Sequence, residues 1–193
     1  MSNLRLLISI LSITFCMESL SQVRIGAKAG YLNSKIELGA HHYGGYSLGA
    51  TGSIPVGSFS NIIAELLFSK RGYSYDNAVV SEGKLKEIKV VFNYVDLPVM
   101  YELKVLPFFT ILGGGYIGIQ GGRSVYYSGV KQSNGMLGKK QVFDYGLLAG
   151  MRFYYRHIFF EGQYQHGLSN PFKDTDVFKS RCFGVNLGFM LPL

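Results

Sequence analysis

Apolar and polar residues alternate in one run after another along most of this chain. Successive side chains of a strand point to opposite faces, so a period of two is typical of strands with one apolar and one polar face. The runs occupy residues 23–31, 46–54, 62–73, 90–104, 108–120, 142–154, 158–167 and 181–191. An even number of strands is what an antiparallel up-and-down barrel needs to close. The pattern therefore predicts an all-β fold, an eight-stranded antiparallel up-and-down β-barrel.

The connections between these runs alternate in length without exception. The short ones are 55–60, 105–107 and 155–157, and the long ones are 32–45, 74–89, 121–141 and 168–180. In outer-membrane barrels the short turns face the periplasm and the long loops face outward. We therefore expect a transmembrane barrel with both chain ends on the periplasmic side.

The N-terminus has the pattern of a removable export signal. Arg5 precedes an apolar stretch over residues 6–15, and small residues follow up to Ser21. We predict a signal peptide of residues 1–21 and an outer-membrane barrel domain of residues 22–193. Cys182 is the only cysteine of the mature chain, so no disulfide can form within it.

Composition argues against other classes of protein. Beyond the signal, no apolar run reaches the about 20 residues that a membrane helix needs. The chain is rich in Gly, Tyr and Phe, and charged residues make up only 16% of it, which favours strands over helices. The net charge of +7 comes with no basic helix, so we expect no nucleic-acid partner.

The two faces of the predicted strands differ in chemistry. One face is bulky and apolar, whereas the other mixes small residues with nearly all the strand charges. Small and long side chains together can fill a narrow eight-stranded lumen, which the bulky face would overfill. Buried charges must be paired, so we predict an ionic network in the lumen and no open pore. Its members are Arg24, Lys28, Glu65, Arg71, Asp96, Glu102, Lys104, Asp144, Arg152 and Glu161.

Two points stay open at this stage. A soluble lipocalin-like ligand-binding barrel has the same alternation with its apolar face inside. In the run 108–120, several glycines leave the facing unassigned. Aromatic residues also fall near the predicted strand ends, and we expect them to form girdles at the lipid–water interfaces. On the long-loop side these are Tyr31, Tyr46, Tyr73, Tyr145, Tyr164 and Phe183.

Five segments resemble the PorT-like family of outer-membrane β-barrels. They are residues 64–73, 94–101, 112–118, 144–146 and 164–170, and the resemblance runs from about Gln22 to the chain end. The resemblance implies an outer-membrane location. The family's founding member is tied to secretion across the outer membrane, and the family defines no catalytic residues that could be carried over to this chain.

An enzyme is the rival class, because some outer-membrane barrels hydrolyse or transfer lipid acyl chains. The candidate pair is His166 with Ser169, since a histidine can activate a serine as nucleophile. Their spacing of three puts them on opposite faces of a regular strand, which favours a plain strand end. His41 and His42, with Glu37 nearby, lack a spaced third ligand and make a weak metal signal.

The sequence therefore predicts a non-enzymatic outer-membrane barrel with a structural or accessory role, in secretion or envelope assembly. We expect no catalytic residues, no cofactor and no metal, and we expect a monomer. The expected partners are outer-membrane lipids and lipopolysaccharide, the barrel assembly machinery and secretion-system proteins. The loop lysines Lys84, Lys86, Lys89, Lys131, Lys139 and Lys140 are candidates for contacts with anionic headgroups.

Overall fold

The computed structural model describes residues 23–36, 41–80, 84–127, 130–132, 142–169 and 179–193. The predicted signal peptide lies outside the described residues, so its cleavage stays a prediction. Among the residues that the structure describes, no helix is long and apolar enough to cross a membrane.

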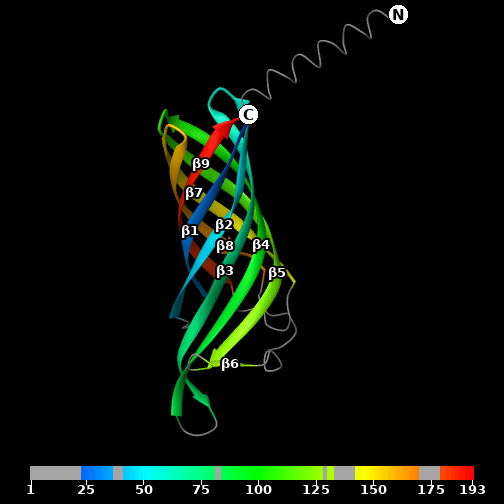
Figure 1. The fold of residues 1–193 in the computed structure, drawn as a ribbon, viewed down its shortest axis with the longest axis vertical. Coiled ribbons are helices and arrows are strands. Elements are labelled where there is room, and N and C mark those ends of the chain that lie inside the picture. The colour runs from blue at the N-terminus through cyan, green and yellow to red at the C-terminus, as the bar shows by residue number, and fades with distance from the viewer. Residues whose placement is uncertain (1–22, 37–40, 81–83, 128–129, 133–141, 170–178) are drawn as a thin grey trace, which may run out of the picture.

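Eight long strands form a closed antiparallel barrel (Figure 1). They are β1 (Arg24–Ile36), β2 (His41–Gly57), β3 (Ser60–Val80), β4 (Lys84–Leu106), β5 (Phe109–Tyr127), β7 (Phe143–Tyr155), β8 (Ile158–Gly167) and β9 (Ser180–Pro192). Each pairs with its neighbours in the order β4-β3-β2-β1-β9-β8-β7-β5, and β4 pairs with β5 to close the ring. The short β6 (Val130–Gln132) pairs with β5 beyond this ring. The predicted fold is confirmed.

Three strands continue past the barrel at the end where the long loops were predicted. β3 and β4 pair from Ser74↔Lys89 out to Val80↔Lys84, although the pairing of β2 with β3 ends at His41↔Ser74. Together with the end of β5 and with β6, they form a sheet that projects beyond the barrel rim (Figure 1). The expectation of a loop over 74–89 is therefore wrong. A strand outside the hydrocarbon needs no apolar face, so its sequence loses the period of two that marks the other strands.

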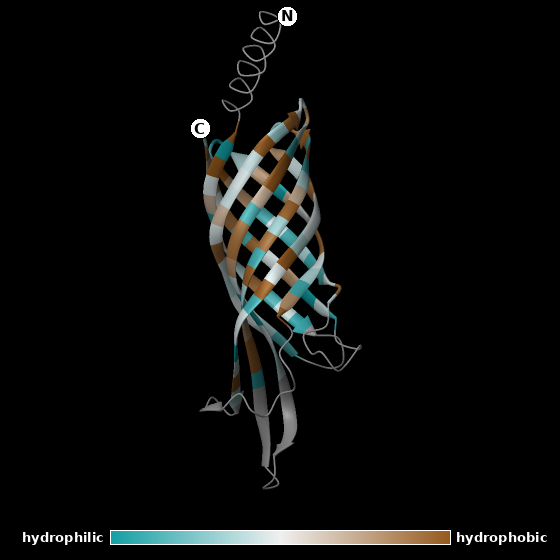
Figure 2. Cartoon of the chain, turned by 90° about the vertical axis from the view of Figure 1, so that its right-hand side faces the viewer, coloured by the Kyte–Doolittle hydropathy of each residue, from teal (hydrophilic) through white to brown (hydrophobic). Residues whose placement is uncertain are grey.

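The exposure of the side chains decides which face is inside. Outward side chains such as Ile25, Leu66 and Leu187 are 49%, 53% and 61% exposed, whereas Lys28 and Arg152 are 1% and 0% exposed. Brown apolar bands alternate with teal polar ones along the strands in Figure 2. An apolar surface of this extent is covered by lipid in a membrane barrel. The lipocalin-like alternative, which needs the apolar face inside, is wrong.

The structure also assigns the faces of β5. Leu112, Tyr116 and Gln120 are buried in the lumen, whereas Ile111 and Ile117 point outward. The sequence left this strand open because glycines occupy both of its faces. Gly118 leaves room in the lumen for the Asp96 carboxylate, because a Cβ at this position would collide with it.

Candidate functional site

The half of the lumen nearer the short turns holds a network of four charged side chains. Lys28 Nζ lies 2.7 Å from Glu65 Oε2 and 2.6 Å from Glu161 Oε1. Arg152 Nη2 lies 3.2 Å from Glu65 Oε1 and also pairs with Glu161. All four side chains are fully buried and come from four strands, β1, β3, β7 and β8. Two cations thus alternate with two anions, and the network is neutral. We call it the inner network.

Neutral polar groups add hydrogen bonds to the inner network. Asn186 Nδ2 donates to Glu161 Oε1 at 2.8 Å, and Thr51 Oγ1 donates to Glu65 Oε1 at 3.2 Å. The Arg152 guanidinium also lies over the Phe159 ring, 4.1 Å from its centroid. Buried charges are tolerated when they are paired and hydrogen-bonded in this way.

Glu102 is the centre of a second group at the turn end of the lumen. It accepts hydrogen bonds from Thr110 Oγ1 at 3.0 Å, from Tyr154 Oη at 2.7 Å and from Asn61 Nδ2. Arg24 lies 3.8 Å from it, and this guanidinium is partly exposed. Tyr154 also accepts a hydrogen bond from Arg152 Nη1 at 3.2 Å, which joins Glu102 to the inner network.

The half of the lumen nearer the projecting sheet is organised around Arg71. Its guanidinium lies 2.5 Å from Asp96 Oδ1 and 3.4 Å from Asp144 Oδ2, and it stacks 4.5 Å from the centroid of the Tyr94 ring. Ser69 donates to Asp96, and Ser169 Oγ donates to Asp144 Oδ1 at 2.5 Å. We call Arg71, Asp96 and Asp144 the outer network. It holds one cation between two anions.

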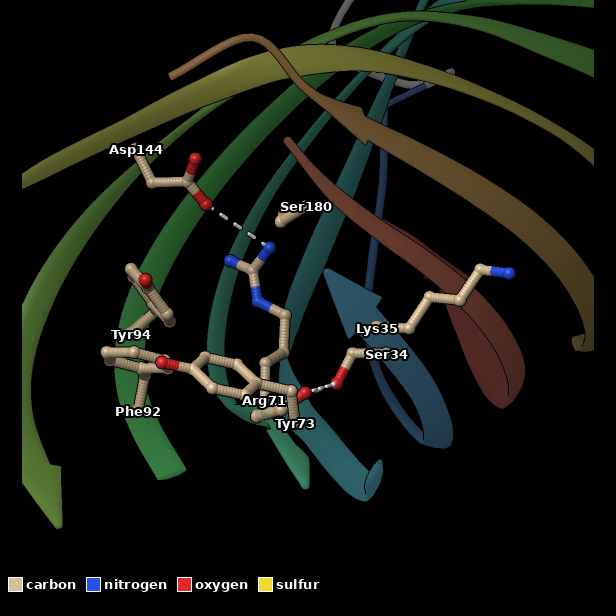
Figure 3. A pocket seen from close by; sticks show the side chains of 9 residues that line it. Ser34, Lys35, Arg71, Tyr73, Phe92, Tyr94, Asp144 and Ser180 are labelled. Atoms are coloured by element: carbon tan, nitrogen blue, oxygen red, sulfur yellow. Dashed lines mark hydrogen bonds and ion pairs between the residues drawn. The ribbon is translucent and has the colours of Figure 1, made fainter. Parts of the chain in front are cut away.

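A small cavity lies beside Arg71 and Asp144 (Figure 3). Its volume is about 30 Å³, which is room for one or two water molecules. Tyr73, Phe92 and Tyr94 line it. The centroid of the Phe92 ring lies 5.9 Å from that of Tyr73 and 6.1 Å from that of Tyr94. The girdle position predicted for Tyr73 is wrong, because this side chain is buried at the outer end of the lumen. Tyr73 is two positions after Arg71 on β3, so the period of two puts both side chains on the lumen face. This spacing could have predicted its burial from the sequence.

An apolar cluster that the sequence analysis missed also fills the lumen. Ile63, Met100, Leu112 and Leu148 pack together with at most 3% exposure. Each of these residues is an even number of positions from a charge or glycine that marked the lumen face of its strand. The period of two alone could therefore have predicted that they point into the lumen. The lumen is thus packed with ionic, aromatic and aliphatic side chains.

Of the ten residues predicted for the ionic network, Lys104 differs from the other nine in ion pairing. Lys104 is only partly buried near the turn end, and it makes no ion pair with the part of the chain that the structure describes. Each of the other nine takes part in at least one ion pair. These pairs join residues up to 133 positions apart in the chain, as for Lys28 and Glu161.

The candidate catalytic pair does not come together. His166 lies on the outward face of β8, and its ring packs 6.5 Å from that of Tyr164, whereas Ser169 is buried against Asp144. His42 hydrogen-bonds Asn33 at 2.7 Å, and Glu37 lies outside the described residues. Within the described ranges, no group of three His, Cys, Asp or Glu could hold a metal ion.

Family comparison agrees with this geometry. Residues 16–173 match the model of the family described as outer membrane protein beta-barrel domain. The chain belongs to this family. The protein is therefore an integral barrel of the outer membrane, as its lipid-compatible surface requires. No match was found among curated protein sequences.

Solved structures show the same fold at low sequence identity. The attachment invasion locus protein Ail of Yersinia pestis is 15% identical, with a TM-score of 0.54, over 88% of this chain and 99% of Ail. Neisserial surface protein A is 9% identical, with a TM-score of 0.53, over 86% of this chain and 96% of that protein. Ail has also been crystallised in complex with the heparin analogue sucrose octasulfate, and that structure matches with a TM-score of 0.52.

Proposed function

We propose that this protein is a non-enzymatic accessory barrel of the PorT-like kind, which anchors a binding surface in the outer membrane for protein secretion or envelope assembly. The observation that carries the proposal is the combination of a filled lumen with a projecting sheet. Ion pairs, aromatic rings and aliphatic side chains occupy the lumen, so transport through it has no structural support. The sheet of β3, β4, β5 and β6 extends the chain beyond the rim, where a partner can reach it.

The sheet suits binding because its strands continue those of the barrel. β4 pairs with β3 through Val80↔Lys84 and with β5 out to Ile88↔Tyr127. A surface built on continuous strands needs little ordering when a partner binds, so it loses less conformational entropy than a flexible loop would. Partners would bind at this end, and the closed barrel would serve as its anchor.

A shortened hairpin tests this proposal directly. Residues 76–87 would be replaced by Asn-Gly, which favours a tight two-residue turn, so that β3 and β4 end near the rim. We expect the variant to enter the outer membrane and to keep its heat-modifiable gel mobility, because the barrel pairings remain. In a deletion strain it should fail to restore the set of secreted and surface proteins that the wild type restores. Full restoration by the shortened variant, or an unchanged set in the deletion strain, would contradict the proposal.

Anionic polysaccharide or lipopolysaccharide is the second part of the proposed binding function. The lysines at 84, 86 and 89 belong to β4, and Lys131 belongs to β6, so two of the strands of the projecting sheet carry positive charge in their sequence. A fold neighbour binds a polysulfated sugar, which supports the idea without assigning it. Replacement of Lys84, Lys86 and Lys89 by Gln should weaken retention on immobilised lipopolysaccharide and reduce its salt dependence. Equal retention would leave the protein-partner proposal in place and remove this one.

The filled lumen makes a further distinction testable. We expect no steady conductance when the barrel is reconstituted in a planar bilayer, because charged side chains occupy the lumen and pair with one another. Steady single-channel steps from the purified protein would show that it is a pore and would overturn the accessory role.

A further inference from the structure

A trough runs across the outer surface of β1, β2 and β3 at the turn end of the barrel. Its floor consists of small outward residues on neighbouring strands, where Ala27 lies opposite Ala50 and Gly52 lies opposite Ala64. Ala29 continues the floor along β1. Two open depressions of about 790 and 440 Å³ adjoin along this floor, where Ala27 and the half-exposed Phe189 line both of them, and together they make up the trough.

The walls of the trough are bulky and apolar. Ile25, Leu66 and Leu191 stand on one part of its border, and Leu48 and Leu187 stand on another. Each of these side chains is about half exposed, with values from 48% to 61%. The outward face thus drops from large side chains to methyl groups and bare backbone within one strand spacing. Both depressions are open to the outside along the barrel surface, so a chain lying in them would keep one side toward the surrounding lipid.

The position in the membrane determines what can fill the trough. It lies on the lipid-facing surface, so it continues the interface between the barrel and the bilayer. It reaches Pro192 and Leu193 at the turn end of β9, which is the periplasmic end in barrels of this kind. The leaflet at this end of an outer membrane is made of phospholipid. Its acyl chains are flexible, unbranched and apolar, which matches a narrow apolar trough.

We propose that this trough is a binding site for one acyl chain of an inner-leaflet phospholipid. A chain lying in the trough contacts protein atoms on its floor and both walls, whereas a chain against the convex barrel surface contacts them on one side. Each contact contributes little, but their sum favours the trough over the rest of the surface. The bound phospholipid would be retained when the surrounding lipid exchanges.

Gly52→Leu places a bulky side chain on the floor of the trough. A Cβ at Gly52 would meet only the carbonyl oxygens of Ala64 and Arg24, at 3.8 and 3.9 Å, which is ordinary contact. Gly113→Leu is the matched control, since this outward glycine of β5 has nothing within 4 Å of an added Cβ and is separated from β2 by β3 and β4. Both variants add the same side chain to the lipid-facing surface.

Native mass spectrometry of the delipidated, refolded barrel with added dioleoylphosphatidylethanolamine tests the proposal. We expect a one-lipid species for the wild type and for Gly113→Leu, and a decrease of about threefold or more for Gly52→Leu. Heat-modifiable gel mobility checks that all three barrels are folded. Equal lipid occupancy in all three would overturn the proposal. A dimer of the wild type that Gly52→Leu dissociates would overturn it too, because the trough would then hold a second copy. Protein extracted from outer membranes that retains lipid A and no phospholipid would overturn the assigned leaflet.

Discussion

The inner and outer networks occupy the same lumen but differ in charge balance and in access to water. The inner network pairs Lys28 and Arg152 with two glutamates, and all four side chains are 0% exposed. The outer network has Arg71 between two aspartates, and the Asp144 side chain is 11% exposed beside a small cavity. The charges of a fully buried network must be neutralised by opposite charges within it. Near the mouth of the barrel, water can solvate a charge that has no such partner. The inner network therefore blocks the lumen. The outer network lies near the mouth of the barrel, where water from outside can reach it.

The largest expected effect comes from removing the cation that joins the inner network to Glu102. Arg152→Met should lower the free energy of unfolding by about 3–5 kcal/mol, because Glu65 and Glu161 would share only Lys28 in a dry site. Urea titration of the barrel refolded into lipid bilayers measures this loss. The double variant Arg152→Met/Glu161→Gln restores the charge balance and should recover part of the stability. A loss below about 1 kcal/mol for the single variant would contradict the view that this network is dry and tightly paired.

A smaller loss is expected from the corresponding change in the outer network. Arg71→Met should lower the free energy of unfolding by about 2–3 kcal/mol, since water at the cavity can solvate Asp144 when its partner is gone. The same titration compares the two variants directly. If Arg71→Met destabilises the barrel as much as Arg152→Met does, access to water does not distinguish the two networks.

Steric support of the inner network gives a third test. A Cβ added at Gly188 would collide with the Phe159 ring, on which the Arg152 guanidinium rests. Gly188→Ala should therefore cost about 1–3 kcal/mol through overpacking. Gly113→Ala faces open space outside the barrel and should change stability by less than about 0.5 kcal/mol. Equal effects at the two glycines would show that the lumen can relax around Phe159.

The smallest effects are expected at the candidate catalytic pair. Ser169→Ala removes a hydrogen bond to Asp144 in the outer network and should cost about 1 kcal/mol. His166→Ala lies on the outward face and should change stability by less than about 0.5 kcal/mol. Both variants should leave the lipid composition of the outer membrane unchanged. A changed acyl composition in either strain would support the hydrolase alternative and assign these residues a role in catalysis.

The sequence by itself determined the strand count of the barrel, the alternation of the two faces and which face carries most of the charged side chains. The period of two put nearly all the strand charges on the face that also carries most of the small residues, and this mixture of small and long side chains indicated the lumen. Family membership and the outer-membrane location agree with that prediction. The sequence did not predict the strands of the projecting sheet. They lack the alternation that marks an apolar face, so they were predicted as loops.

Only the tertiary structure decided which charges meet. Glu65 and Arg152 are 87 residues apart and belong to strands that are not neighbours in the sheet, so nothing in either strand specifies their contact. Closure of the barrel and the stagger of its strands set the height of each side chain along the lumen. For the same reason, the glycine-rich face of β5 and the trough over β1, β2 and β3 became visible only when neighbouring strands were aligned. Alternation tells which face a residue is on, but register determines what lies beside it.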